Sequence, residues 1–270
     1  MGILDFIFKK EKTVEQGESN KGYRNYNKGF SGTGKIYLNV PYSEKDQVKE
    51  LGARWDPDIK KWYYKGLVRD YIKFAKWISD DEEITIAFEH VYIVERIRTC
   101  YKCGKQTRVI GLALGEHLVV YRDDDGTYKC DCFEDVDEFP NLYVTWELCE
   151  RDIPPALLEY LKSNYNVHVG KSRIGGTYFA NHCEHCDAIQ GSNYLMEENI
   201  AFFNQTDKDI EELKKYTIYD IGIEEDIVLN WGGVYSGCEY VYWKYAQVKE
   251  IKLPQSKYED VITYKELYNL

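Results

Sequence analysis

The sequence predicts an α+β protein in which a small β-α-β-α module is followed by a sheet-rich body that contains a zinc ribbon. Tyrosine is unusually common, with 25 copies, and aromatic side chains suit half-buried pleated surfaces. Strand-like runs dominate from Glu83 onward, and two Cys-x-x-Cys turns lie between strand-like segments. These observations favour sheet in the body, whereas residues 35–80 alternate strand and helix signals.

The composition limits the classes of protein and partner that fit. The chain has 270 residues and is 44% hydrophobic, which allows a sizeable core and excludes a chain disordered throughout. Its net charge of −11 excludes attraction of the whole molecule to phosphate, so any nucleic-acid site must be a local basic patch. No apolar run approaches the ~20 residues of a membrane span, and no secretory signal is present. We therefore expect a cytoplasmic protein with reduced cysteines and no membrane partner.

Changes in composition divide the chain into four segments. The first is polar, rich in Gly, Ser and Asn, and without apolar periodicity, which is typical of a flexible tail. The expected division is residues 1–34 as the tail, 35–80 as the module, 81–202 as a zinc-ribbon body with an insertion, and 203–270 as a C-terminal α+β extension packed on the body.

Local signals define the elements of the module. Ser43 suits the N-cap of a helix and Gly52 suits its C-terminal stop. The Asp-Pro-Asp sequence that follows indicates a turn. The expected order is a strand at 36–40, a helix at 43–53, a turn at 56–58, a strand at 61–65 and a helix at 67–78.

The body has many strand-like runs and two predicted helices. One helix is expected at 153–163, where two prolines suit the first turn. The other is expected at 206–216, where acids precede lysines as the helix dipole favours. The acidic stretch 122–139 is predicted to be a loop or a hairpin arm. Strands are expected at 84–88, 91–97, 107–114, 117–122, 142–148, 176–181 and 239–248.

Two Cys-x-x-Cys turns, separated by 79 residues (104–182), are the strongest chemical signal in the chain. Structural zinc is held by four ligands in a tetrahedron, and each such turn presents two thiolates. Gly104 directly follows the first turn, where a knuckle needs positive φ. The sequence therefore predicts a structural zinc ion at the tips of two hairpins, bound by Cys100, Cys103, Cys183 and Cys186.

A second cysteine pair leaves an alternative open. Cys130-Asp-Cys132 could replace one knuckle, or build a second metal site with His117, His182 or His185. A closed four-cysteine site has no open coordination position, so it would support folding rather than catalysis. Catalytic signatures such as Gly-x-Ser-x-Gly and His-Glu-x-x-His are absent from the chain. We therefore expect a non-enzymatic protein.

The module is locally basic. Residues 35–79 hold ten Lys and Arg against six Asp and Glu, a net of +4, while the rest of the chain has 25 against 40, a net of −15. Such a patch can contact phosphates, and tryptophan can stack on an unpaired base. The alternative is that the tryptophans form the core of a tiny domain and the lysines its solvated face. The residues predicted for nucleic-acid binding are Arg54, Trp55, Lys60, Lys61, Trp62 and Lys65.

The segment 37–64 resembles a small domain of unknown function found in bacterial and plasmid-borne proteins, often at the ends of conjugation-associated primases. The matching residues are Leu38, Asn39, Val40, Pro41, Lys45, Lys49, Leu51, Gly52, Ala53, Arg54, Trp55, Asp56, Lys61, Trp62 and Tyr63. The following chain is similar to longer members of that family, in which a split zinc ribbon follows the small domain. The resemblance implies a bacterial, plasmid or phage origin and a zinc fold, but no established activity.

Three functional hypotheses follow. The first is a zinc-stabilised, non-enzymatic accessory protein that binds nucleic acid through residues 35–80. The second is a protein–protein interaction module that uses the acidic, sheet-rich body to engage a protein partner. The third is a metal-dependent enzyme acting on nucleotides or nucleic acid, with a catalytic metal ligated in part by His182 or Cys132.

Overall fold

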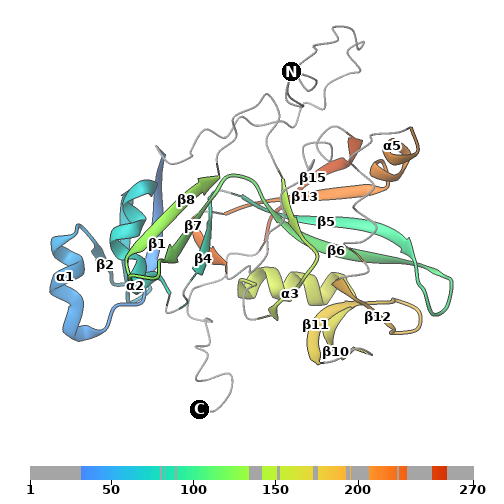
Figure 1. The fold of residues 1–270 in the computed structure, drawn as a ribbon, viewed down its shortest axis with the longest axis horizontal. Coiled ribbons are helices and arrows are strands. Elements are labelled where there is room, and N and C mark those ends of the chain that lie inside the picture. Colours follow the sequence, from blue (N-terminus) through green and yellow to red (C-terminus); the bar gives the residue numbers. More distant parts are fainter. Residues whose placement is uncertain are drawn as a thin grey trace, which may run out of the picture.

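The structure, a computed structural model, has the α+β fold that the sequence predicts, with helices beside many strands (Figure 1). Its described strands form two three-stranded sheets, one four-stranded sheet and one five-stranded sheet. Residues 1–31 of the predicted tail lie outside the described part of the chain. The structure describes residues 32–79, 81, 83–88, 90–133, 142–150, 153–172, 176–192, 195, 207–223, 225–229 and 245–253.

The module contains one strand more than predicted. The additional strand is β2, at residues 54–56 where only a turn was expected, and it pairs with the strand that follows it. It has three residues, two of them exposed, so it carries almost no alternation of apolar and polar residues. The elements are β1 (Thr33–Leu38), η2 (Tyr42–Glu44), α1 (Lys45–Glu50), β2 (Arg54–Asp56), β3 (Lys61–Leu67), η3 (Val68–Phe74) and α2 (Ala75–Ile78).

The helix predicted at 67–78 is mostly a 3₁₀ helix, η3, followed by one turn of α-helix, α2. A 3₁₀ helix has three residues per turn, so side chains three apart lie on one face. Val68, Tyr71 and Phe74 have this spacing, and all three are buried. The tighter helix therefore places these three residues on the side that faces the core.

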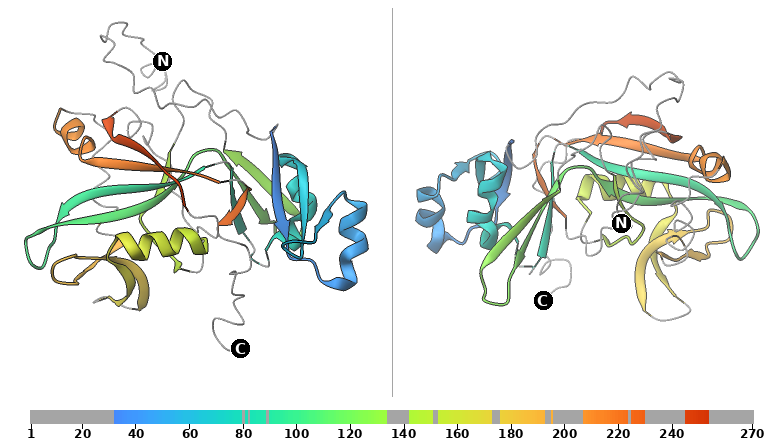
Figure 2. Two further views of the ribbon diagram at one scale, coloured as in Figure 1. Left: turned by 180° about the vertical axis from the view of Figure 1, so that it is seen from behind. Right: turned by 45° about the horizontal axis from the view of Figure 1, so that its top comes forward.

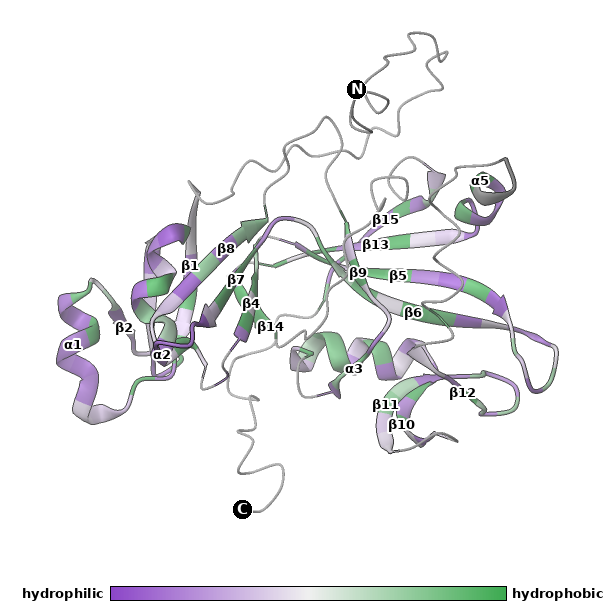
Figure 3. Ribbon diagram, in the orientation of Figure 1, coloured by the Kyte–Doolittle hydropathy of each residue, from purple (hydrophilic) through white to green (hydrophobic). Residues whose placement is uncertain are grey.

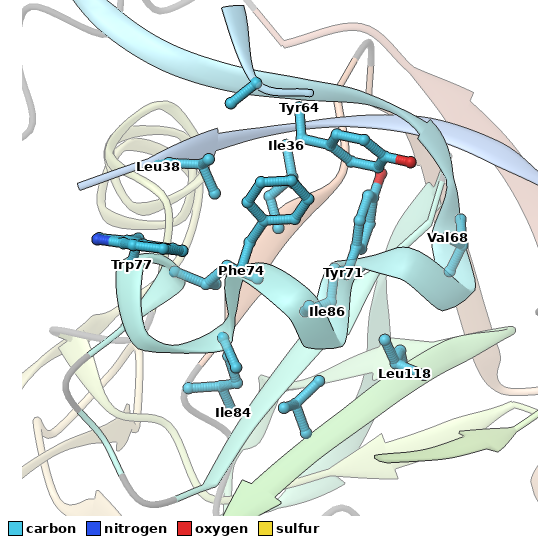
Figure 4. Close-up of a cluster of buried hydrophobic side chains, with 14 of the residues drawn as sticks. Ile36, Leu38, Tyr64, Val68, Tyr71, Phe74, Trp77, Ile84, Ile86 and Leu118 are labelled. Carbon is cyan, nitrogen blue, oxygen red and sulfur yellow. The ribbon is translucent and has the colours of Figure 1, made fainter. Parts of the chain in front are cut away.

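The core of the module continues into the body (Figure 4). Ile36 and Tyr64 project from the sheet β1-β3-β2 toward Phe74 of the helical layer. On the other side of that layer lie Ile84 of β4 (Glu83–Ala87) and Leu118 of β7 (His117–Arg122). One apolar cluster thus extends from the module into the body. Helices η3 and α2 lie in its middle, between the sheet β1-β3-β2 and the strands β4 and β7.

A buried polar contact also joins the module to the body. The Tyr71 hydroxyl donates to Asp226 Oδ2 at 2.5 Å, and both residues are buried. The Asp226 amide donates to the Lys35 carbonyl at 2.8 Å. A Cβ at Gly34 would lie 1.9 Å from Asp226 Oδ2, so this approach requires glycine. The segment that leads into β14 (Ile227–Leu229) therefore docks closely on the module.

The body is built on the four- and five-stranded sheets. The four-stranded sheet has the order β14-β4-β7-β8, with β8 at Tyr128–Phe133. The five-stranded sheet has the order β15-β13-β5-β6-β9. Its strands are β5 (His90–Thr99), β6 (Gln106–Leu114), β9 (Tyr143–Thr145), β13 (Tyr216–Gly222) and β15 (Gln247–Ile251).

Helix α3 (Pro155–Asn164) covers one face of the five-stranded sheet, burying Leu157 and Leu161 in one cluster with residues of β5 and β6. A further sheet follows, made of β10 (Val167–Lys171), β11 (Thr177–His182) and β12 (Ile189–Gln190). Helix α5 (Asp207–Leu213) precedes β13. None of the described helices is long and apolar enough to cross a membrane.

Several element predictions in the body are confirmed and others need correction. Helix α3 and strand β11 lie where expected, and β8 forms the predicted hairpin arm as far as residue 133. Strand β9 is shorter than the predicted 142–148, and most of the predicted strand 239–248 lies outside the described residues. Strands β10, β13 and β14 were not expected, because β10 and β13 mix charged and apolar residues and β14 has only three residues.

Candidate metal centre and module sheet face

The structure brings the two Cys-x-x-Cys turns together at the tips of two hairpins. The first turn joins β5 to β6, and the second joins β11 to β12. Both have the same backbone pattern. Gly104 N donates to Cys100 O and Asp187 N donates to Cys183 O, each at 2.9 Å. The residue after the second cysteine has positive φ in both turns, 71° at Gly104 and 57° at Asp187. The two tips are thus equivalent knuckles, the second using an aspartate, which tolerates this conformation.

The four sulfurs lie close enough together to share one metal ion. The Sγ atoms of Cys100 and Cys186 are 3.8 Å apart, and those of Cys103 and Cys183 are 3.7 Å apart. All four lie within 4.8 Å of one another. A tetrahedral zinc ion with Zn–S bonds of about 2.3 Å requires S···S separations of about 3.8 Å. The donor set therefore fits a tetrahedral thiolate site with little movement.

N–H donors surround the sulfurs of the first cysteine in each knuckle. The amides of Lys102 and His185 donate to Cys100 Sγ and Cys183 Sγ respectively, each at 3.4 Å. The buried Gln190 adds its side-chain Nε2, 3.5 Å from Cys100 Sγ. Such donors favour the thiolate, which is the form that binds metal.

The pKa values of the thiols differ across the cluster. Burial disfavours the Cys100 thiolate, but backbone donors from Cys103 and Lys102 outweigh burial and lower the pKa of Cys100 to about 6. The Ala188 amide favours the Cys186 thiolate, yet burial and the neighbouring sulfurs raise the pKa of Cys186 to about 12. Without a metal the cluster therefore holds protons at neutral pH, and a metal would displace them.

Polar contacts seat the second knuckle against β6. Arg108 donates from Nε and Nη2 to Glu184 Oε1, at 2.8 and 2.6 Å. Burial disfavours the Glu184 carboxylate, but these donors outweigh it and lower the pKa of Glu184. The Asn181 side chain pairs with both the amide and the carbonyl of Ile110, each at 2.8 Å. Arg108, Asn181 and Gln190 were not predicted, because each reaches a partner far away in the sequence.

The side chains considered as alternative metal ligands do not join the cluster of four sulfurs. His185 Nε2 is 2.8 Å from the Gln106 carbonyl. His182 stacks on His168, with ring centroids 3.6 Å apart, and its Nδ1 is 3.0 Å from the Ala180 carbonyl. Cys130 and Cys132 lie on β8 and pack beside the core of the module. Within the described ranges, one group of three or more His, Cys, Asp or Glu side chains is placed to hold a metal ion, and it consists of the four knuckle cysteines.

The residues predicted for nucleic-acid binding separate onto two faces of the sheet β1-β3-β2. In the pairing of β2 with β3, Trp55 is opposite Trp62, with ring centroids 5.8 Å apart, and Trp62 packs against the core. Side chains alternate along a strand, so Arg54, Lys61 and Lys65 point to the other face. Lys60 lies in the turn before β3, with φ of 56°. The structure thus groups the basic side chains of the strands but places both tryptophans on the opposite side.

This other face, which we call the outer face, carries two tyrosines and an ion-pair network. Lys35 Nζ donates to the Tyr37 hydroxyl at 2.6 Å, and Tyr37 donates to Asp56 Oδ2 at 3.0 Å. Lys35 Nζ also lies 3.2 Å from Glu225 Oε1 of the body and 4.9 Å from the ring centroid of Tyr63. Lys35 is thus paired with acids, in contrast to the exposed Arg54 and Lys65 of β2 and β3.

Comparison with known proteins finds a likeness for the module. Residues 35–79 match a family described as Domain of unknown function (DUF5710). Two Escherichia coli proteins, each named DNA primase TraC, are similar to this chain. One is 56% identical over 46 residues and the other 54% identical over 41 residues, or 17% and 15% of this chain.

These stretches make up only 4% and 3% of the two primases. No solved structure matches the chain. The predicted resemblance to a small, primase-associated domain of unknown function is confirmed for the module.

Proposed function

We propose that this chain is a zinc-stabilised, non-enzymatic accessory protein that binds DNA through residues 35–80. The observation that carries the proposal is the likeness of the module to segments of two DNA primases. The local charge agrees, because residues 35–79 have a net charge of +4 within a chain of net charge −11. Three of its basic residues, Arg54, Lys61 and Lys65, share one face of the sheet.

The metal in this proposal is zinc in a structural role, bound by Cys100, Cys103, Cys183 and Cys186. Four soft thiolates at tetrahedral separations are typical of structural zinc sites. Such a site leaves no coordination position for a substrate, which favours the non-enzymatic hypothesis over the catalytic one. The reduced thiols that it requires agree with a cytoplasmic location.

Fluorescence anisotropy of the full chain with DNA oligonucleotides, across a salt series, tests the proposal. Binding should weaken steeply with salt. The double variant Arg54→Ala/Lys61→Ala should make the negative slope of log K against log[salt] shallower by about 1.4, the value for two lost contacts to single-strand phosphates.

The matched control is Lys45→Ala/Lys49→Ala, which removes the same charge from helix α1 of the module. It should bind nearly as well as the unaltered chain. No DNA binding at low salt would overturn the proposal and favour a protein partner of the acidic body.

A further inference from the structure

We infer that the DNA bound by the module is single-stranded and lies on the outer face of the sheet β1-β3-β2, with an unpaired base against the ring of Tyr63. The inference rests on the proposed function and deepens it. It differs from the sequence prediction, in which Trp55 and Trp62 stack on the base.

Tyr63 is central on the outer face. It lies in the middle strand of three, opposite Tyr37 of β1 and opposite Arg54 of β2. Lys61 and Lys65 lie two positions before and after it, about 7 Å away along the strand. Tyr63 is half-buried and Lys35 Nζ lies 4.9 Å from its ring centroid, so a base must approach the part of the ring that Lys35 leaves open. An aromatic ring within a group of cations is the arrangement that stacks a base and contacts its flanking phosphates.

The shape of this surface favours a single strand over a duplex. Bases in a duplex are read by a helix or ribbon that enters a groove. The module's helices η3 and α2 cannot serve, because they lie buried between two sheets. The exposed helix α1 is also a poor candidate, because its two lysines are balanced by Asp46 and Glu50. The outer face offers a ring instead, and a ring can stack only on a base that is not already within a duplex.

Glu225 of the body limits the site on the side of β1. Lys35 lies 3.2 Å from Glu225 and 3.9 Å from Asp56, so its charge is compensated within the protein. Exposed positive charge lies instead on β2 and β3, at Arg54 and Lys65. The phosphate backbone should therefore follow β2 and β3, with Glu225 repelling it beyond β1.

The test compares single-stranded and duplex DNA of one sequence, and the matching RNA, against the full chain and three variants. Tyr63→Leu should weaken single-strand binding about fivefold or more, the loss of one stacked base, whereas Tyr63→Phe should retain it. Trp55→Leu removes the exposed tryptophan of the opposite face and should change the affinity less than twofold. An oligonucleotide containing 2-aminopurine should be quenched by the unaltered chain and by Tyr63→Phe, but not by Tyr63→Leu.

A gain of affinity provides a second readout that a folding defect cannot imitate. Glu225→Gln should strengthen single-strand binding, because it releases Lys35 to contact phosphate. An unchanged affinity in that variant would contradict the proposal that Glu225 limits the DNA site beyond β1.

Equal binding of duplex and single strand, tighter binding of RNA, or full binding by Tyr63→Leu would overturn the inference. If Arg54→Ala/Lys61→Ala still weakened DNA binding and its salt dependence, the proposed function would stand without the inference. Failure of every DNA form to bind would instead overturn the proposed function itself.

Discussion

The module and the cysteine knuckles lie at opposite ends of the molecule and are stabilised in different ways (Figures 1 and 2). The module belongs to an apolar cluster that contains the fully buried side chains of Ile36, Tyr71 and Phe74 and extends into the body. At the knuckles the buried cluster comprises only Cys100, Cys183 and Ala188, with Cys186 packed against it. Hydrophobic burial can account for the stability of the module but not for that of the knuckles.

The sheet itself changes character toward the knuckles. Figure 3 shows β5 and β6 becoming more hydrophilic toward the tip of their hairpin. The polar contacts there, such as Arg108 with Glu184, are partly exposed and contribute about 1 kcal/mol each. Structural zinc supplies apparent binding energies of about 10–16 kcal/mol in small zinc-finger peptides. Metal would therefore stabilise the knuckles, where side-chain burial is lacking.

The largest expected effect comes from removing one knuckle cysteine. Cys183→Ser should abolish zinc binding and loosen both hairpin tips, because three ligands no longer close the site. Metal content by mass spectrometry should fall from one zinc per chain to nearly none. Cys130→Ser, outside the cluster, is the matched control and should keep the metal. One zinc retained in Cys183→Ser would refute the four-cysteine assignment.

A substitution in the apolar core should destabilise the module. Phe74→Ala removes a fully buried ring and should lower the free energy of unfolding by about 3–5 kcal/mol in urea denaturation. Tyr42→Ala, at a side chain that is 83% exposed, should cost less than about 0.5 kcal/mol. The zinc content of both variants should stay at one per chain. Loss of metal in Phe74→Ala would show that the two regions are not independent.

The contact between Tyr71 and Asp226 should have an intermediate effect. Tyr71→Phe takes one buried donor from a buried carboxylate and should cost about 1–3 kcal/mol. Tyr64→Phe is the matched control, since Tyr64 donates at 3.1 Å to the partly exposed Asp70. Its loss of stability in the same denaturation experiment should be smaller. Equal losses would mean that burial of Asp226 adds nothing to the contact.

The smallest expected effect is a pH dependence within the module. Donors from Lys76 and Trp77 lower the pKa of Glu44 below its usual 4.5. A lowered acid pKa adds stability that is present above the unfolded value and is lost as pH falls through the folded value. Glu44→Gln should therefore reduce the thermal midpoint at pH 7 but hardly at pH 3. Glu50→Gln serves as the exposed control, and the same pH dependence in both variants would contradict this account.

The sequence predicted which four cysteines come together, because each knuckle is a local structure. Cys100 and Cys103 lie in one tight turn, and Gly104 marks it; the second turn has the same spacing. The β-α-β-α pattern of the module was also read from local signals. Strand β2 was missed because three mostly exposed residues do not show a period of two.

Tertiary contacts account for the remaining differences. The face occupied by each tryptophan depends on the register of β2 against β3, which no local pattern specifies. Arg108 and Glu184 are separated by 76 positions, and Tyr71 and Asp226 by 155. Such pairs form only when distant segments of the chain come together, so charge and spacing in the sequence could not identify them.

Hydrogen exchange of the full chain with and without a zinc chelator tests the central claim most directly. We expect chelation to accelerate exchange at residues 99–106 and 181–190 while leaving the amides of β1 and β3 protected. That result would show metal stabilising one end of the molecule and apolar packing the other. Unchanged exchange at the knuckles, or equal loss of protection in both regions, would contradict the account.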